Sequence, residues 1–414
     1  MVIARDLLRR GRGELCQPGA VSEASPPEEV RLRVAFDATP LIGPRTGVGE
    51  FCAGALQALA KRGDLAMGAY SMSGRRRHAI ASEVPPGVAV YDRPMAAGPL
   101  SKSWAHWSFP PAELFVGRAD VVHGTNFVVP PAWWAATVVT VHDLTPLRFP
   151  EMCLPPARAY PELVRKALGR GAWVHTHTSS VAQEVIASLG ARLDRVRVVH
   201  PGVWPPGSAG PRHEPGGAVG RSSAARSVLL PDWVTRYVLA VGTVEPRKDL
   251  PSLVQAFGTF AKAYPGLALV HAGPDGWGSA QLEEAIAECP ADDQVVRLGW
   301  VDDQARDVLM AGATVFAFPS LYEGFGLPPL QAMAAGAPVV ATRCGALEEV
   351  LGDAARLVDV GDVDALAEAL EELLGDEAAR LELVRRGRER AALYTWEACA
   401  CGLAALYHDA NHAR

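Results

Sequence analysis

The sequence predicts an α/β protein of two domains, each built around a parallel β-sheet that is covered by helices. Short runs of β-branched residues alternate with Ala- and Leu-rich stretches along the chain, which is typical of parallel sheets. The chain has 414 residues, 49% of them hydrophobic, which is more than one core usually holds. A stretch rich in Pro, Gly, Ser and Arg between Trp204 and Asp232 divides this pattern in two. We therefore expect two Rossmann-like domains joined by a linker.

The buried strands and the domain limits can be placed on the chain. We expect strands at 33–36, 121–123, 137–141 and 196–199 in the first half, and at 237–241, 268–271, 295–298, 315–318 and 338–341 in the second. Apolar residues at helical spacing predict helices at 253–260 and 366–373. This gives a leader (1–30), a first domain (31–205), a linker (206–232), a second domain (233–393) and a last helix within 394–414 that packs back on the first domain.

Composition excludes several classes of protein. A formal net charge of −6 argues against a nucleic-acid partner, which would call for a strongly basic domain. The seven cysteines include no Cys-x-x-Cys pair, as expected of a reduced, cytoplasmic protein. The first thirty residues hold no apolar run that could serve as a signal peptide, and no window of about twenty apolar residues could span a membrane.

A peripheral contact with the inner face of a membrane stays open at this stage. Residues 75–77 form an arginine triplet, and four tryptophans, Trp104, Trp107, Trp133 and Trp134, occur in the same half of the chain. The plainer interpretation is a solvated loop and ordinary core tryptophans.

The most informative segment is 319–331, which follows a predicted buried strand and precedes a helix expected at 332–335. Ligands of such sheets bind outside the carboxyl ends of the strands. Gly324 and Gly326 allow close approach of the backbone, and Glu323 places a carboxylate at the mouth of the loop. The glycines could alternatively serve only a tight turn.

A second segment, 242–249, follows the first strand of the second half and contains Arg247 and Lys248. Two cations in such a loop can stabilise a leaving group that gains negative charge. In another context, an Arg-Lys pair would more often belong to a solvated face.

Three sets of polar residues or glycines mark the first half. Gly47 and Gly49 precede a helix expected to begin near Phe51, and His142 ends a buried strand. His123 ends another strand and could contact an acceptor. For both histidines, hydrogen bonds within the protein are the alternative.

Together, these motifs resemble, in order, those of the retaining two-domain (GT-B) glycosyltransferases of family 4, and the resemblance covers about 33–407. It implies that the cofactor-free enzyme binds a nucleotide-sugar donor through Gly47, Gly49, Arg247, Lys248 and the loop residues Phe325, Gly326 and Leu327. It also implies that Glu323 and His142 contact the reacting sugar. The family's second glutamate corresponds to Gln331, whose amide could still bind a ribose hydroxyl, and Asp249 stands where many relatives carry Asn.

The resemblance also indicates where the donor base would bind and how the reaction would proceed. Asp302 or Asp303 could accept the two adjacent N–H groups of guanine, or could cap a helix, so GDP-mannose is the favoured donor. The histidines are not spaced as a helical metal pair, so we expect a metal-independent reaction. The resemblance implies a front-face displacement onto a glycan, lipid-linked or small-metabolite acceptor. The alternatives are a nucleotide-sugar epimerase on the same fold and a binding protein that has lost turnover.

Overall fold

The computed structural model describes residues 31–43, 46–204 and 229–414. The predicted leader and most of the predicted linker lie outside the described residues. The described chain forms two compact units. The first holds 31–202 together with Tyr394–Arg414, and the second holds 203–204 and 229–393.

The first unit contains a parallel sheet of seven described strands in the order β3-β2-β1-β4-β5-β6-β7. The strands are β1 (Leu32–Asp37), β2 (Leu65–Tyr70), β3 (Ala89–Tyr91), β4 (Val121–Gly124), β5 (Ala136–Val141), β6 (Trp173–Thr176) and β7 (Val196–Val198). Its helices include α2 (Gly47–Leu59), α3 (Ala97–His106), α4 (Glu113–Val116), α5 (Thr145–Arg148), α6 (Tyr160–Gly169), α7 (Ser179–Leu189) and α16 (Trp396–His412). The strand order reverses between β1 and β4, which is where ligands bind in open α/β sheets.

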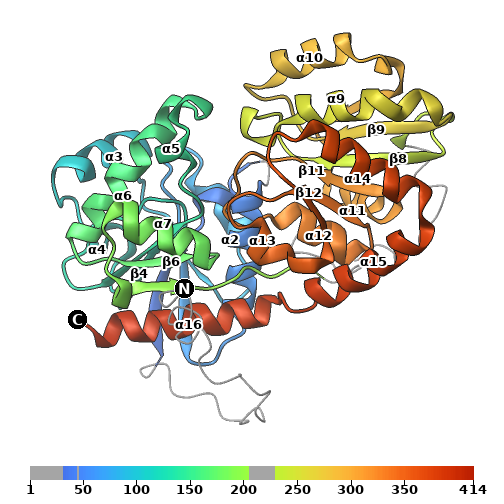
Figure 1. Ribbon diagram of the computed structural model, residues 1–414. Coiled ribbons are helices and arrows are strands. Elements are labelled where there is room, and N and C mark those ends of the chain that lie inside the picture. The colour runs from blue at the N-terminus through green and yellow to red at the C-terminus, as the bar shows by residue number, and fades with distance from the viewer. Residues whose placement is uncertain (1–30, 44–45, 205–228) are drawn as a thin grey trace. The chain divides into compact units, whose positions relative to one another are not determined.

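The C-terminal helix α16, the long red helix in Figure 1, packs on α2 and β5 of the first unit. Gly54 of α2 faces Trp396, and a Cβ at this glycine would lie 2.3 Å from the indole ring. At the other end, the hydroxyl of Tyr407 lies 2.7 Å from Nδ1 of the buried His123. A small residue and a buried hydrogen bond therefore fix this helix on the first sheet.

The second unit contains six described parallel strands in the order β10-β9-β8-β11-β12-β13. They are β8 (Arg236–Val241), β9 (Leu267–Ala272), β10 (Val295–Gly299), β11 (Val315–Phe318), β12 (Val339–Thr342) and β13 (Arg356–Val358). The helices are α9 (Leu250–Phe260), α10 (Ser279–Glu288), α11 (Asp303–Gly312), α12 (Leu327–Ala335), α13 (Leu347–Leu351), α14 (Val363–Gly375) and α15 (Glu377–Ala391). Helices α9, α10 and α14 share one apolar core with the sheet.

The strand order of the second sheet reverses between β8 and β11. The two segments that stand out in the sequence, 242–249 and 319–331, follow these two neighbouring strands. Parallel pairing brings their carboxyl ends to the same edge of the sheet, so the fold places the two loops side by side.

The strands expected from the sequence are all present, and each predicted limit lies within one residue of the observed one. Strands β2, β3 and β13 are not predicted. The sequence of β2 is Leu-Ala-Met-Gly-Ala-Tyr, without a β-branched residue, and β3 and β13 are three-residue strands with a single valine each. Two predicted helix starts are wrong. Helix α12 begins at Leu327, because a first turn tolerates the prolines at 328 and 329, and α2 begins at Gly47 rather than near Phe51.

Candidate functional site

The segment after β8 is shaped by its backbone. Gly242 has a φ of 144°, a conformation that favours glycine, and Pro246–Lys248 form a short 3-10 turn. Asp249 has a φ of 47° and directly precedes α9. Asp and Asn are the residues other than Gly that adopt this left-handed conformation most readily, so Asp249 can fill the structural position of an Asn. Burial raises the pKa of its carboxyl, while the hydroxyl and amide of Ser252 oppose the shift.

The segment after β11 turns directly into α12. Gly326 has a φ of 91° and precedes the first residue of the helix. A Cβ at this position would lie 2.3 Å from Cδ2 of Leu347, so both the backbone angle and the packing require glycine. The loop is held against α13 in this way, and Glu323 is buried within it with 8% of its surface exposed.

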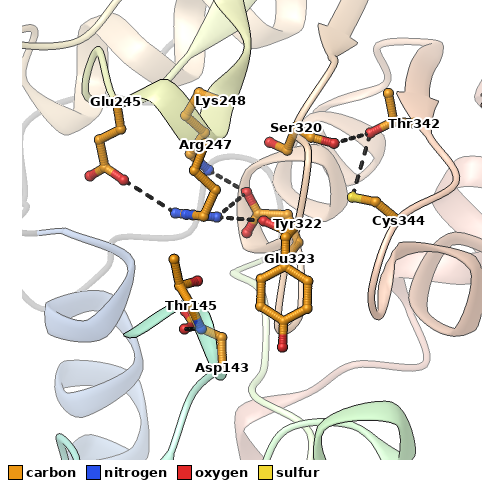
Figure 2. A network of polar contacts seen from close by, with 10 residues as sticks. All are labelled: Asp143, Thr145, Glu245, Arg247, Lys248, Ser320, Tyr322, Glu323, Thr342 and Cys344. Carbon is orange, nitrogen blue, oxygen red and sulfur yellow. Dashed lines mark hydrogen bonds and ion pairs between the residues drawn. The ribbon is translucent and has the colours of Figure 1, made fainter. Parts of the chain in front are cut away.

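The two segments meet in an ion-pair network (Figure 2). One carboxylate oxygen of Glu323, Oε1, lies 2.6 Å from Nη1 of Arg247 and 2.7 Å from Nζ of Lys248. Arg247 also donates to the carbonyl of Tyr322 at 2.9 Å. The ammonium group of Lys248 lies 4.4 Å from the ring centroid of Phe318, within the range of a cation–π contact. The structure thus brings together three residues that the sequence predicts to act on one donor.

Burial and the ion pair act in opposite directions on the pKa values of Glu323 and Lys248. Burial raises the pKa of Glu323, but Arg247 and Lys248 outweigh it, and the net shift is downward. Burial lowers the pKa of Lys248, and although the carboxylate of Glu323 opposes that shift, the net shift is downward. Glu245 lies 3.4 Å from Arg247, so two cations face two carboxylates. An arriving anion must therefore share the cations with Glu323 and Glu245.

The other residues predicted to bind donor lie on the same unit with different surroundings. Phe325 and Leu327 are buried, so any donor contact would come from their main chain. Gln331 lies half-buried within α12. Asp302 caps α11 by accepting the amide of Ala305 at 2.7 Å, and Asp303 forms an ion pair with Arg306 at 2.9 Å. Asp302 is thus the helix cap that the sequence left as an alternative.

In the first unit, the glycines form the start of α2. Nothing lies within 4 Å of a Cβ built on Gly47, so the backbone is open to a ligand there, while Gly49 is buried. The first amides of a helix have no partner within it and attract anions. This end of α2 can therefore receive a negatively charged group.

His142 is buried and held by two hydrogen bonds. Its Nε2 donates to the carbonyl of Thr125 at 2.7 Å, so its Nδ1 accepts from Nε2 of His177 at 2.8 Å. The pKa of His142 is lowered by burial, with the Thr125 carbonyl and Asp143 opposing the shift. These are the internal hydrogen bonds that the sequence left as an alternative, and a substrate contact through the ring would have to replace one of them.

The acceptor role expected for His123 does not fit its surroundings. The side chain is fully buried, Nδ1 bonds the Tyr407 hydroxyl, and Nε2 bonds the Thr140 hydroxyl at 2.7 Å. Thr140 in turn contacts His175, whose Nε2 donates to the carbonyl of Val199. His123 therefore belongs to a hydrogen-bonded chain in the core, and both of its ring nitrogens are already bonded within the protein.

Two polar residues at strand ends were not singled out in the sequence. Asp37 ends β1 and is fully buried, and His271 lies near the end of β9 with 5% of its surface exposed. A polar side chain directly at the end of an apolar strand is the signal that could have found both.

Of the four tryptophans singled out in the sequence, one lies in the core and three are exposed. Trp104 is a core residue, and its indole N–H donates to the carbonyl of Pro110. Trp107, Trp133 and Trp134 are half or more exposed. Within the described residues, no helix is long and apolar enough to cross a membrane.

Acidic residues are not arranged as a metal site in the described part of the chain. No group of three or more His, Cys, Asp or Glu side chains there could hold a metal ion. The sequence has an Asp-x-Asp pair at Asp362 and Asp364, and Asp362 caps α14 by accepting the amide of Ala365.

Models of two glycosyltransferase families match the two halves of the chain. The model "Glycosyltransferase Family 4" matches residues 45–205, and the model "Glycosyl transferases group 1" matches residues 228–390, which include the ion-pair network. The chain belongs to the family 4 glycosyltransferases. It is a transferase, and the resemblance to this family that the sequence predicts is confirmed.

This glycosyltransferase is similar to known proteins in sequence and in structure. It is 37% identical over 167 residues to the O-antigen chain mannosyltransferase B of Escherichia coli, which is 39% of this chain and 43% of that protein. It is 28% identical over 443 aligned residues to a D-inositol 3-phosphate glycosyltransferase of Acidothermus cellulolyticus, covering 94% and 93% of the two chains. The structure of sucrose-phosphate synthase from Thermosynechococcus elongatus matches with a TM-score of 0.71 at 21% identity, covering 93% of this chain and all of that one. The predicted GT-B fold is thereby confirmed.

Proposed function

We propose that this glycosyltransferase transfers a hexose with retention of configuration from a nucleoside-diphosphate sugar to a glycan, lipid-linked or small-metabolite acceptor. The observation that carries the proposal is the contact of Glu323 with Arg247 and Lys248 at the carboxyl ends of β8 and β11. Two cations and a carboxylate at this point match the two ends of a sugar diphosphate.

Each group has a task in the reaction. The acceptor hydroxyl attacks C1 of the sugar on the face from which the diphosphate departs, and the C1–O bond to the diphosphate breaks. The acceptor's proton passes to a diphosphate oxygen, so the protein needs no nucleophile and no base of its own. Arg247 and Lys248 stabilise the charge that the leaving diphosphate gains, and Glu323 accepts hydrogen bonds from sugar hydroxyls. We propose that the reaction requires neither a metal nor a cofactor.

The first unit contributes backbone groups in this account. The amides at the start of α2, around Gly47 and Gly49, bind a negatively charged donor oxygen. Because the ring nitrogens of His142 bond Thr125 and His177, we propose that His142 contacts the sugar through its main chain.

Mannose is the favoured sugar and GDP the favoured carrier. The support for mannose is the similarity to a mannosyltransferase over 39% of the chain. The support for GDP is Asp303, although its pairing with Arg306 means that a guanine would have to compete for the carboxylate. Gln331 would offer its amide to the ribose.

Product analysis tests the proposal. The enzyme is incubated with GDP-mannose, UDP-glucose and ADP-glucose, with and without a mixture of acceptors, and nucleotide release and the anomeric configuration of products are followed by NMR. We expect nucleotide release that depends on acceptor, and a glycoside with the configuration of the donor. Inverted configuration contradicts the retaining mechanism.

The same experiment separates the alternatives. A changed nucleotide sugar formed without acceptor would favour an epimerase. A protein that binds nucleotide without turnover, and gains turnover through Gln331→Glu, would favour a binding protein that has lost activity.

We propose separately that the enzyme is cytoplasmic and contacts a membrane at its surface. The proposal rests on the exposed indoles of Trp107, Trp133 and Trp134. Sedimentation with vesicles of anionic lipid tests it, and equal sedimentation of the triple Trp→Ser variant would contradict it.

A further inference from the structure

His271 lies beside the donor site but takes no part in the chemistry described above. It is the fifth of the six residues of β9, the strand next to β8. Its Nε2 lies 2.9 Å from the carbonyl oxygen of Gly242, the first residue of the segment that carries Arg247 and Lys248. Because a carbonyl can only accept, Nε2 carries the proton and donates. His271 also lines a small pocket with Gly242, Thr243, Lys248, Phe318 and Pro319.

The hydrogen bond sets the orientation of one peptide plane. In a trans peptide, the carbonyl of one residue and the N–H of the next point in opposite directions. The carbonyl of Gly242 faces His271 and Gly273, and a Cβ at Gly273 would lie only 1.9 Å from this oxygen. Since β8 lies between β9 and β11, the N–H of Thr243 is turned toward the β11 side, where Lys248 and Glu323 lie. This N–H has no acceptor among the described residues.

Stability alone does not explain a histidine at this position. Its second ring nitrogen, Nδ1, is buried and has no hydrogen-bond partner within the described residues. Burial lowers the pKa of His271, and the ring is therefore neutral near pH 7. An unsatisfied buried nitrogen is unfavourable, so an apolar side chain would be expected at this strand end if packing were the only requirement.

We infer that His271 is a positioning residue, which holds the Gly242–Thr243 peptide so that the Thr243 N–H donates to an oxygen of the bound nucleoside diphosphate. The inference rests on the proposed function. It adds a backbone N–H group, fixed in its orientation, to the two cations of the site. This N–H group is aligned before the ligand arrives.

Two variants of His271 separate the hydrogen bond from packing. In His271→Gln, the side-chain amide can still donate to the Gly242 carbonyl, and in His271→Leu no donor is left. Gln294→Leu is a matched control, because Gln294 is also buried and donates to the carbonyl of Leu267 at the amino end of the same strand, away from the site. Melting temperatures are recorded for all four proteins.

The readout is the dissociation constant for GDP, UDP, ADP and dTDP from calorimetric titration. We expect His271→Leu to bind the preferred nucleotide about tenfold more weakly, the scale of one lost hydrogen bond, with an unchanged or higher melting temperature. His271→Gln should stay within about threefold of the wild type. Gln294→Leu should melt earlier and bind normally.

Two results would overturn the inference while leaving the proposed function intact. One is a His271→Leu protein that binds as tightly as the wild type, and the other is equal weakening in both His271 variants. If the wild type binds none of the four nucleotides, the proposed function fails and this inference fails with it.

Discussion

The ammonium group of Lys248 lies 2.7 Å from Oε1 of Glu323, although 75 residues separate the two along the chain. Parallel pairing of β8 and β11 brings them together. The ion pair is almost completely buried, with 14% and 10% of the two side chains exposed. Removing one partner of such a pair leaves the other charge uncompensated. Substitution of Glu323 and substitution of Lys248 should therefore have different effects on diphosphate binding.

Glu323→Gln should separate catalysis from diphosphate binding. Without the carboxylate, Arg247 and Lys248 lose their main counter-charge, so we expect the ligand-free protein to lose about 3 kcal/mol of unfolding free energy. Nucleoside diphosphate should bind as tightly as before or more tightly, since it supplies the missing negative charge. Turnover should fall about 100-fold because the sugar loses a carboxylate acceptor. Urea unfolding, calorimetry and nucleotide release check the three results, and a tenfold loss of diphosphate affinity would be inconsistent with this account.

Lys248→Met should have the opposite effect on binding. The substitution keeps the length of the side chain and removes the cation, so diphosphate affinity should fall about 10- to 100-fold. Lys262→Met is the control, because within the described residues Lys262 pairs only with Asp293, and both side chains are exposed. Titration of both variants with the preferred nucleotide measures the difference. Equal affinity of the two would remove Lys248 from the donor site.

The buried histidines should make the protein sensitive to mild acid. Burial lowers the pKa values of His123, His142, His175 and His177, in the case of His175 to about 3. Below about pH 6.5 the unfolded chain therefore binds more protons than the folded one. The free energy of unfolding should fall by up to about 1.4 kcal/mol per pH unit for each such histidine as the pH drops below 6.5, and for His175 this continues down to about pH 3.

Urea unfolding at pH 7, 6 and 5 measures this slope. The exposed His412→Ala variant, at the end of α16, should show the same slope as the wild type. A free energy of unfolding that stays constant between pH 7 and 5 would mean that the histidines are hydrated or charged in the folded protein.

Asp37 should make the free energy of unfolding fall as the pH rises, which is opposite to the effect of the buried histidines. Burial raises its pKa to about 6, even though its carboxylate accepts the amide and hydroxyl of Thr39. Because the folded pKa lies above the unfolded value of about 3.8, the stabilising contribution is complete below pH 3.8 and is lost as the pH rises through 6. Asp37→Asn, which stays neutral, should therefore be up to about 3 kcal/mol more stable than the wild type at pH 7 and equally stable near pH 4. Destabilisation at pH 7 would show that the ionised carboxylate has a favourable partner.

The sequence predicts those elements of the fold that depend on residues close together along the chain. The apolar runs at Val238 and Val315 identify buried strands, and the order of the strands implies that the loops after them meet. The same reasoning cannot tell where a strand-end side chain points. His123 and His142 both end buried strands, yet their hydrogen-bond partners include Tyr407 and Thr125, which come from distant segments.

Backbone conformation accounts for the remaining differences. The sequence shows Asp249 as an added charge, and only the φ of 47° explains why an Asp suits that position. The start of α12 at Leu327 depends on Gly326, whose conformation and contact with Leu347 are three-dimensional properties.

Calorimetric titration of the wild-type protein with GDP, UDP, ADP and dTDP, without added metal, tests the central claim most directly. It examines the Arg247–Lys248–Glu323 site before any acceptor is known. The account predicts saturable binding of one nucleotide clearly better than the others, with GDP favoured, and loss of that binding in Lys248→Met. Absence of binding by all four nucleotides at millimolar concentration would contradict the donor site, and with it the proposed transfer reaction.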